Sequence, residues 1–414
     1  MTGVGFLILF IIVLLESFEI FLEIVNIKYA RRIVYGDKRA IPDFLKSDEL
    51  KRSIDYQWDK IKVGIVESLV SLFFLLVIFI TGIIQWYATK IMNYTESEFI
   101  RALLFLGSIQ LITGLISLPF SLYRQFVVEE KYGFNKMSFS LFFRDLFLGT
   151  IIGGIISSIL LFVIIKIIEI FPRSWWLIAS IFTYIFILFL NYIYPVLIAP
   201  LFNRFEPIDD EELIDGIKDL SEKSGFDISE VVKMDASKRS THSNAYFSGF
   251  GKKKRVVLFD TLIDKLSVDE LLAVLAHELG HFKMKHILKN LFISFIMILI
   301  SFLLTYFVIN KDFIYLWFGF DKSIFIGLFL VTLLFAPFKF IISPIFMSIS
   351  RKHEFEADSF AAKLLKGGMT LKSALIKLHK DNLSNPFPHP LYVFLNYSHP
   401  PLLERIKRLE SYGV

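Results

Sequence analysis

The sequence predicts an all-α polytopic membrane protein, in which seven transmembrane helices enclose a water-filled chamber, joined to a small α+β part outside the membrane. Three observations predict this fold class. Hydrophobic residues make up 55% of the 414 residues, and a mean hydropathy of +0.59 is too high for a soluble chain of this length. Continuous apolar stretches are long enough to cross a bilayer. The first stretch also carries acidic residues, which favour a polar interior over contact with lipid.

The apolar stretches define the predicted spans. About 18 or more apolar residues are needed, because the hydrocarbon core is about 30 Å thick and a helix rises about 1.5 Å per residue. The spans are predicted at residues 4–25, 63–87, 99–120, 146–170, 175–199, 287–309 and 323–347. The first should remain as a span, since its positive charges follow it and it lacks the cleavage site of a signal peptide.

Basic residues predict the orientation of the chain, because cytoplasmic loops collect Lys and Arg. The first and third loops are rich in them, whereas the loops on the opposite side are short and nearly uncharged. The basic residues are Lys28, Arg31, Arg32, Lys38, Arg39, Lys46, Lys51, Arg52, Lys60 and Lys62 in the first loop, and Arg124, Lys131, Lys136 and Arg144 in the third. With an odd number of spans, the N-terminus lies outside and the C-terminus in the cytoplasm.

Composition excludes several kinds of chemistry. The chain has no cysteine, so disulfides, thiolate metal sites and cysteine nucleophiles are excluded. A metal ion would have to be bound by histidine and carboxylate. The net charge of +5 does not indicate nucleic-acid binding, because the basic residues lie just outside the predicted spans and accompany no nucleic-acid-binding motif.

Four regions follow from this pattern. Residues 1–199 hold five spans, 200–286 form a first cytoplasmic part, 287–347 hold two spans and 348–414 form a second cytoplasmic part. In the first cytoplasmic part, residues 209–224 read as an amphipathic helix. Arg255 to Phe259 reads as a strand, with Ser240 to Phe250 as its hairpin partner and a turn around Gly249 and Gly251 to Lys254. The second part begins with a helix at residues 353–365 and ends with an amphipathic helix after Pro401.

The first chemical motif is His277-Glu278-Leu279-Gly280-His281. It follows a capping box formed by Ser267 and Glu270, so it lies on a helix that is expected to run toward, or directly into, the sixth span. Spacing of i, i+4 puts both imidazoles on one face, where both reach one metal ion. Glu278 points elsewhere and is suited to take a proton from a metal-bound water. A chance match in a polar helix is the alternative.

A third protein ligand is required, because a catalytic zinc takes three ligands and keeps one position open. Glu354 is the candidate, with Asp358 one turn on to accept the free ring N–H of a ligand histidine. The pattern alone does not separate Glu354 from Glu356 or His353. A solvated acidic face is a further interpretation of the same residues.

Further candidates lie in three places. Glu16, Glu19 and Glu23 share one face of the first span, and a wet internal chamber is favoured over a packed, protonated pair for Glu16 and Glu19. Residues 244–250 read either as an edge strand that offers its backbone to an extended peptide or as an ordinary hairpin strand. His399 and Arg405 are candidates for contact with a developing oxyanion or with substrate carbonyls.

Six blocks of sequence together resemble the integral-membrane zinc CAAX prenyl proteases, the type I CAAX endopeptidases, over nearly the whole chain. The blocks are LYRQFVVEEKYGFNKMSF at 122–139, IAPLFNRF at 198–205, KRSTHSNAYFSGFGKKKRVVLFDTL at 238–262, LAHELGHFKMKH at 275–286, HEFEADSFAAKL at 353–364 and YSHPPLLERI at 397–406. The Ile-, Lys- and Phe-rich composition suggests a prokaryotic member.

The resemblance implies seven spans around a large water-filled chamber closed on the cytoplasmic side by a metalloprotease part. It implies one Zn²⁺ per chain, bound by His277, His281 and Glu354, with Asp358 behind them and Glu278 and His399 in catalysis. The substrate-binding residues that it implies are Asn244, Ala245, Tyr246, Phe247 and Arg405.

The implied activity is hydrolysis of peptide bonds near the C-terminus of prenylated CAAX-type or similar hydrophobic peptides. The partners would be this substrate and the lipid bilayer, with the chain monomeric and no nucleic acid bound. It would lie in the cytoplasmic membrane of a prokaryote or the endoplasmic reticulum membrane of a eukaryote. The alternatives are a heat-shock type of quality-control membrane protease, which has fewer spans, and a seven-span receptor or transporter in which the metal motif is accidental.

Overall fold

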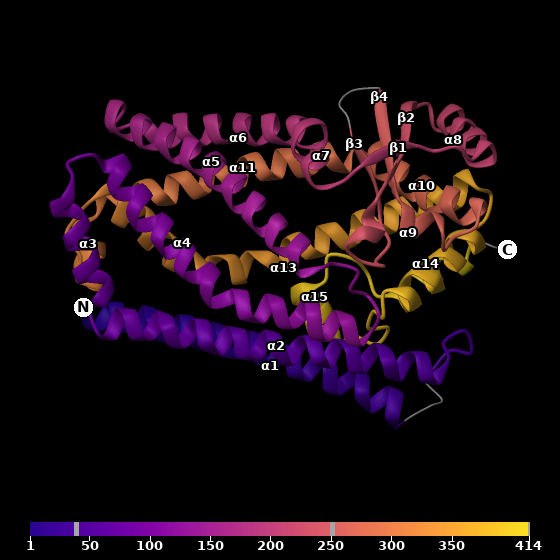
Figure 1. Ribbon diagram of the computed structural model, residues 1–414, viewed down its shortest axis with the longest axis horizontal. Helices are drawn as coiled ribbons and strands as arrows, with labels where there is room; N and C mark the ends of the chain where they lie inside the picture. Colours follow the sequence, from indigo (N-terminus) through magenta and orange to yellow (C-terminus); the bar gives the residue numbers. More distant parts are fainter. Residues whose placement is uncertain (37–40, 249–252, 413–414) are drawn as a thin grey trace.

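The computed structural model describes residues 1–36, 41–248 and 253–412, which form an elongated array of helices with a small sheet at one end (Figure 1). In this part of the chain, seven helical segments are long and apolar enough to cross a membrane. They are Gly3–Tyr35 (α1), Ser47–Ile80 (α2), Glu98–Tyr123 (α4) with the π-helical Arg124–Glu129, Phe139–Ile170 (α5), Trp175–Ile193 (α6) with the π-helical Tyr194–Ile198 and Ala199–Phe202 (α7), His286–Asn310 (α11) and Ile324–Leu364 (α13). The seven predicted spans are confirmed.

The predicted end of the second span at residue 87 is wrong. Helix α2 ends at Ile80, and Gly82 has a φ of 75°. Glycine adopts this left-handed backbone because it has no Cβ atom. The chain therefore turns, and Ile83–Tyr94 forms a separate helix, α3. Hydropathy missed the break because both helices are apolar.

Helix α13 connects the membrane part to the metal-binding motif without a break. It is 41 residues long, and only its first part matches the seventh predicted span. The boundary predicted after residue 347 marks where α13 becomes polar, and the helix continues to Leu364. Because one rigid helix carries both the span and Glu354, the position of that carboxylate is coupled to the membrane part.

The part outside the spans is built on a four-stranded sheet in the order β1-β2-β4-β3. The strands are Phe205–Pro207 (β1), Asp227–Met234 (β2), Ala245–Ser248 (β3) and Lys253–Phe259 (β4). Strand β4 pairs parallel to β2 and antiparallel to β3, so the predicted hairpin is confirmed. Its turn at Gly249 to Lys252 lies outside the described residues. The first two strands were not predicted from the sequence.

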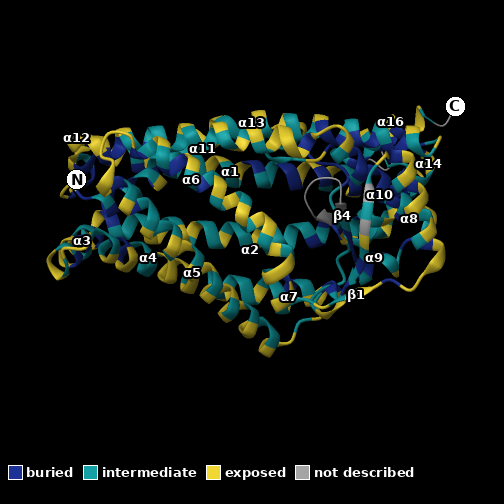
Figure 2. Ribbon diagram, turned by 90° about the horizontal axis from the view of Figure 1, so that it is seen from above, coloured by how far each residue is buried: buried dark blue, intermediate teal, exposed yellow. Residues whose placement is uncertain are grey.

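Helices pack around this sheet and enclose a hydrophobic core at this end of the molecule. They are Glu211–Ser224 (α8), Asp260–Ile263 (α9), Val268–Lys283 (α10), Met369–Asp381 (α14) and Leu402–Glu410 (α16), while Pro390–Asn396 (α15) lies toward the spans (Figure 1). Fully buried residues from the sheet and the helices share one core, among them Leu213 of α8, Val256 of β4, Leu279 of α10 and Leu409 of α16. Figure 2 shows this concentration of buried residues around α10.

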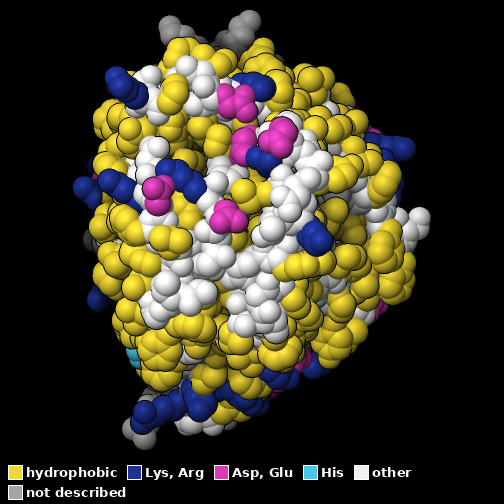
Figure 3. Space-filling model, turned by 90° about the vertical axis from the view of Figure 1, so that its left-hand side faces the viewer, with side chains coloured by type: hydrophobic (Ala, Val, Ile, Leu, Met, Phe, Trp, Pro, Cys, Tyr) yellow, Lys and Arg dark blue, Asp and Glu magenta, His cyan; other side chains and the backbone are white. Residues whose placement is uncertain are grey.

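The opposite end of the molecule has a largely hydrophobic surface with scattered acidic and basic side chains (Figure 3). Its loops adjoin α3 and the short helix Asp312–Phe318 (α12). The expectation that these loops are nearly uncharged is wrong. Their charges pair locally, as Arg101 does with Glu98 at 2.8 Å and Lys322 with Asp312 at 2.6 Å. They therefore add little net positive charge to this end.

Candidate metal centre and chamber

Helix α10 presents His277 and His281 one turn apart. The helix begins with the predicted capping box, in which the Ser267 hydroxyl accepts the Glu270 N–H and the Glu270 carboxylate accepts the Ser267 N–H. The Nε2 atoms of the two histidines lie 3.3 Å apart. Two imidazoles at this separation on one helical face are arranged to share one ion.

Helix α13 places Glu354 opposite these histidines. Its Oε2 lies 3.5 Å from His277 Nε2 and its Oε1 lies 3.4 Å from His281 Nε2. One ligand atom from each of the three residues lies within 4.8 Å of the others. The two helices approach closely at Gly280, where a Cβ atom would lie 2.9 Å from the Ala357 Cα. Glycine between the two histidines therefore lets α13 bring its carboxylate within reach.

Asp358 and Arg405 support His277 from behind. Asp358 is fully buried, and its Oδ1 lies 2.8 Å from His277 Nδ1. Arg405 donates to both oxygens of Asp358, at 2.8 Å from Nε and 2.6 Å from an Nη atom. A carboxylate on Nδ1 fixes the tautomer in which Nε2 faces the site. Arg405 is thus tied to Asp358, with its other Nη atom 3.7 Å from Glu354 Oε2.

The residues present fit a divalent metal ion. Glu354 Oε2 is buried without a hydrogen bond of good geometry, although His399 Nδ1 lies 2.9 Å from it. Burial lowers the pKa of His277, but the carboxylates of Asp358 and Glu354 outweigh burial and raise this pKa to about 9. These carboxylates therefore stabilise positive charge between the imidazoles, which a bound cation would supply instead of a proton.

The alternative ligands named from the sequence lie elsewhere. Glu356 Oε2 lies 2.8 Å from His286 Nε2, and the ring of His353 stacks on that of His286 at 3.9 Å between centroids. Both residues thus lie on a different side of α13 from Glu354. The geometry favours Glu354 among the three.

Glu278 is half-buried on α10. Within the described residues it makes no hydrogen bond and no ion pair, so its carboxylate is available to a water molecule or a substrate. Its negative charge contributes to raising the pKa of the buried Arg405 guanidinium, after the larger effect of Asp358. This arrangement leaves a proton acceptor beside the metal ligands.

Strand β3 forms the edge of the described sheet and contacts α10. Ala245, Tyr246 and Phe247 pair with Leu258, Val257 and Val256 of β4, and the Asn244 carbonyl accepts the Phe259 N–H at 3.1 Å. The other edge of β3 carries no partner strand in the part of the sheet that the structure describes. The exposed-edge interpretation is therefore the one that the geometry supports.

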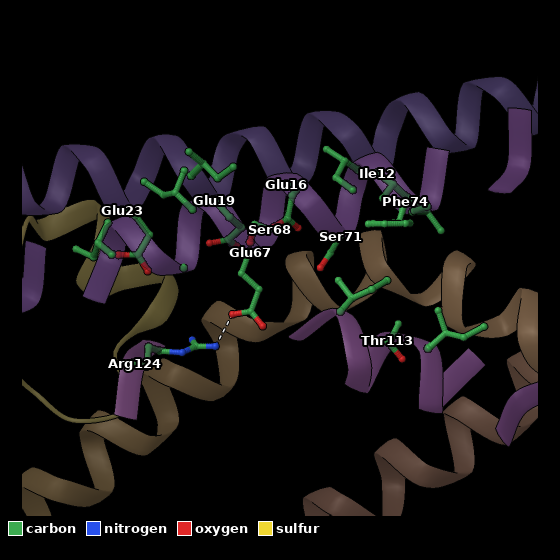
Figure 4. Close-up of a pocket in the computed structure, with 18 of the residues that line it drawn as sticks. Ile12, Glu16, Glu19, Glu23, Glu67, Ser68, Ser71, Phe74, Thr113 and Arg124 are labelled. Carbon is green, nitrogen blue, oxygen red and sulfur yellow. Dashed lines mark hydrogen bonds and ion pairs between the residues drawn. The ribbon is translucent and has the colours of Figure 1, made fainter. Parts of the chain in front are cut away.

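A cavity of about 1240 Å³ lies among the spans, and its lining includes polar groups. Glu16, Glu19 and Glu23 of α1 line it, as Figure 4 shows, together with Glu67 of α2 paired with Arg124. The remaining labelled residues of its wall are Ile12, Ser68, Ser71, Phe74 and Thr113. The expected chamber is confirmed as a cavity, and the acidic face of the first span points into it.

Sequence reasoning missed two tyrosines of the cavity wall. Tyr392 lies within α15 and Tyr397 directly follows this helix, and the Tyr392 hydroxyl donates to Glu23 at 2.6 Å. His399 follows two residues after Tyr397. Tyrosines in a hydrophobic sequence carry no local signal for such a role, and only the return of the chain to α1 brings them there.

The fold and site define a class: a metallopeptidase embedded in the membrane. Residues 32–204 match the family described as CAAX prenyl protease N-terminal, five membrane helices, and residues 207–412 match peptidase family M48. The chain belongs to the CAAX prenyl protease family. A metal ion is therefore part of its chemistry, and the non-enzymatic receptor or transporter interpretation is excluded.

Individual relatives match over nearly their whole length. The CAAX prenyl protease 1 homologs of Taenia solium and Homo sapiens are each 34% identical to the chain; the matches cover 98% and 96% of this chain and 95% and 94% of theirs. The crystal structure of Saccharomyces mikatae Ste24p is 31% identical, with a TM-score of 0.92 over 99% of this chain and 100% of that one. These relatives are eukaryotic, and a prokaryotic source for this chain stays a prediction.

Proposed function

We propose that this membrane metalloprotease is a zinc endopeptidase that cleaves prenylated CAAX-type peptides near their C-terminus. The observation that carries this is the convergence of His277, His281 and Glu354 in a chain whose relatives are named CAAX prenyl proteases. Two imidazoles, one carboxylate and an open fourth position are the donor set that catalytic zinc takes.

The chain's own residues supply the rest of the mechanism. A bound zinc ion would make a coordinated water acidic near neutral pH and polarise the scissile carbonyl. Glu278 accepts the proton of the attacking water on a carboxylate oxygen and passes it to the leaving amine. His399 has a side chain that is 65% exposed, with Nδ1 against Glu354. When both ring nitrogens carry hydrogen, it would donate from Nε2 to the developing oxyanion.

Substrate would bind beside α10 as an extended peptide. Asn244 to Phe247 on the edge strand β3 offer backbone donors and acceptors, as in recognition by strand addition. Arg405, which lies behind Glu354, would donate hydrogen bonds to the backbone carbonyls of the substrate. The cavity among the spans extends to Tyr397, two residues before His399, and we place an apolar or prenylated segment of the substrate in it.

The same proposal covers the organisation of the chain. Residues 1–199 and 287–347 form the membrane part, and 200–286 and 348–414 form the catalytic part on the cytoplasmic side. The termini lie at opposite ends of the molecule (Figure 1), as an odd number of spans requires. We place the protein as a monomer in the endoplasmic reticulum membrane, or in the cytoplasmic membrane if the source is prokaryotic. The match of residues 32–204 disfavours the heat-shock type of protease.

The test measures metal content and the cleavage of a farnesylated CAAX peptide and its unprenylated twin. Purified wild type and Glu278→Gln are compared, because the amide keeps the size of the side chain but cannot accept the proton. We expect about one zinc ion in both proteins and cleavage of the farnesylated peptide by wild type alone.

Other outcomes divide the proposal into its parts. Equal cleavage of the two peptides would remove prenyl recognition and keep the protease. Wild type without zinc after preparation in metal-replete buffer, or a Glu278→Gln protein as active as wild type, would overturn the catalytic assignment.

A further inference from the structure

A second histidine–carboxylate pair lies behind the candidate metal ligand His281. His286 Nδ1 is 3.1 Å from His281 Nδ1, and His286 Nε2 is 2.8 Å from Glu356 Oε2. His286 is 1% exposed. A histidine this deeply buried in contact with a ligand needs a reason beyond packing, because its ring nitrogens require partners.

If His281 binds a metal through Nε2, the hydrogen bonds from His281 to His286 and from His286 to Glu356 can run in only one direction. His281 Nδ1 must then carry the hydrogen and donate it to His286 Nδ1. His286 must carry its own hydrogen on Nε2, which it donates to Glu356. Each ring is a neutral imidazole with one donor and one acceptor, so the chain of bonds is complete from the carboxylate to the metal face.

The backbone is bent where this contact requires it. Lys285 has a φ of 58°, between the end of α10 at Lys283 and the start of α11 at His286. In an uninterrupted helix His286, five residues after His281, would point about 140° away from it, since each residue turns the helix by about 100°. The expectation that α10 runs directly into the span is therefore wrong. A left-handed backbone is unfavourable for a residue with a Cβ atom such as lysine, and the turn directs His286 back onto His281.

Glu356 is itself held in place. Lys289 Nζ lies 4.0 Å and Lys352 Nζ 3.9 Å from its oxygens, and the His353 ring stacks on His286 with an interplanar angle of 13°. Both lysines thus lie within ion-pairing distance of the carboxylate that His286 contacts. The stacked ring restricts rotation of His286. The pair is thus oriented from both ends.

We propose that His286, backed by Glu356, is a positioning residue that fixes the tautomer and orientation of His281. This inference rests on the proposed metal centre. Each of the two candidate histidine ligands would then be oriented by a carboxylate. Asp358 contacts His277 directly, whereas Glu356 acts on His281 through the ring of His286. Outer partners of metal-bound histidines typically change metal affinity by about 10- to 100-fold when removed.

The experiment measures zinc affinity of the purified full-length protein by competition with a chelating dye, without any substrate. The first variant is His286→Leu, which fills the site but cannot accept a hydrogen bond. The second is His286→Asn, whose Oδ1 occupies the place of the imidazole Nδ1 and can accept the same hydrogen. Glu356→Gln weakens the acceptor at the far end. His242→Gln is the matched control, because His242 also contacts a carboxylate, that of Glu129 at 3.4 Å, far from the metal centre.

We expect His286→Leu to lower zinc affinity by about 10- to 100-fold and Glu356→Gln by less, with His286→Asn close to wild type. Visible spectra of the cobalt-substituted proteins should shift in the leucine variant and not in the asparagine variant. Rescue by asparagine separates positioning from packing, since leucine fills the site better than asparagine but only asparagine accepts the hydrogen bond.

An affinity of His286→Leu within about threefold of wild type would overturn the inference, as would an asparagine variant as weak as the leucine variant. Glu356→Gln, a change at a partly exposed residue, provides a second reading if His286→Leu fails to fold: no loss of affinity there also overturns it. Failure of the proposed function is a separate result, because in that case wild type itself would bind no zinc.

Discussion

The protease end of this molecule and the chamber among its spans are packed in different ways. Around α10 the structure has a continuous core of fully buried side chains, and its charged groups are buried in pairs. Among the spans it encloses a cavity of about 1240 Å³ lined by half-buried acidic groups (Figures 2 and 4). A metal centre needs ligands held to a fraction of an ångström, whereas a chamber for substrate needs space. The dense packing at the protease end therefore suits a metal centre, and the open packing among the spans suits a substrate chamber.

Charge pairs should show the largest contrast between the two regions. Asp358→Asn removes the charge that the 11%-exposed Arg405 side chain requires, whereas Glu67→Gln breaks the pair with Arg124 in the chamber wall. An unpaired buried charge destabilises by about 3–5 kcal/mol. We expect an effect of this size for Asp358→Asn, with loss of metal affinity, and less than about 1 kcal/mol for Glu67→Gln, because the Arg124 side chain is 38% exposed. Chemical unfolding in detergent measures both, and equal effects would contradict the contrast.

Added methyl groups test the close packing directly. Gly280→Ala would place a Cβ 2.9 Å from the Ala357 Cα, whereas no atom lies within 4 Å of a Cβ added at Gly107 of α4. Overpacking against a backbone atom destabilises by about 1–3 kcal/mol. Gly280→Ala should therefore lower both the unfolding free energy and zinc affinity, since α13 carries Glu354.

Gly107→Ala is the control, and it should be neutral or slightly stabilising because alanine favours helix. A Gly280→Ala protein with wild-type zinc affinity would show that the helices separate without moving the carboxylate.

The sequence contained most of the fold and much of the site, for physical reasons that differ between elements. Span positions follow from hydropathy, and the i, i+4 spacing of His277 and His281 follows from helical geometry. The break at Gly82 and the turn at Lys285 were not visible, because both depend on backbone conformation within otherwise helical sequence. His286 was missed for the same reason: only the turn at Lys285 brings it to His281.

A histidine of α14 predicts a pH dependence of stability. His379 is half-buried, its Nε2 atom is buried without a hydrogen-bond partner among the described residues, and burial lowers its pKa from 6.5 to about 4. The unfolded state then binds the proton more tightly than the folded state. The contribution of neutral His379 to the stability of the folded state is therefore complete above pH 6.5 and is lost as pH falls toward 4. We expect the unfolding free energy to fall by about 1 kcal/mol between about pH 7 and pH 5.5 from this group.

His379→Leu isolates this contribution. The variant should lose that part of the pH dependence, when both proteins are unfolded in chelator so that metal release does not contribute. A variant with the same pH profile as wild type would place the titrating group elsewhere.

The smallest effect is expected for the acidic face of α1. Glu16 is half-buried, lines the cavity and makes no hydrogen bond or ion pair within the described residues. If water fills the cavity, Glu16→Gln changes the unfolding free energy by less than about 0.5 kcal/mol, because neither side chain loses its solvation. Leu22→Ala on the same helix is the comparison, since Leu22 is 0% exposed and its truncation should destabilise by about 2–5 kcal/mol. A clear stabilisation by Glu16→Gln would instead mean that the carboxylate is held in a dry, low-dielectric interior, because removing a poorly solvated acid is favourable there. The chamber would then be packed more like the protease core, and the contrast between the two regions would not hold.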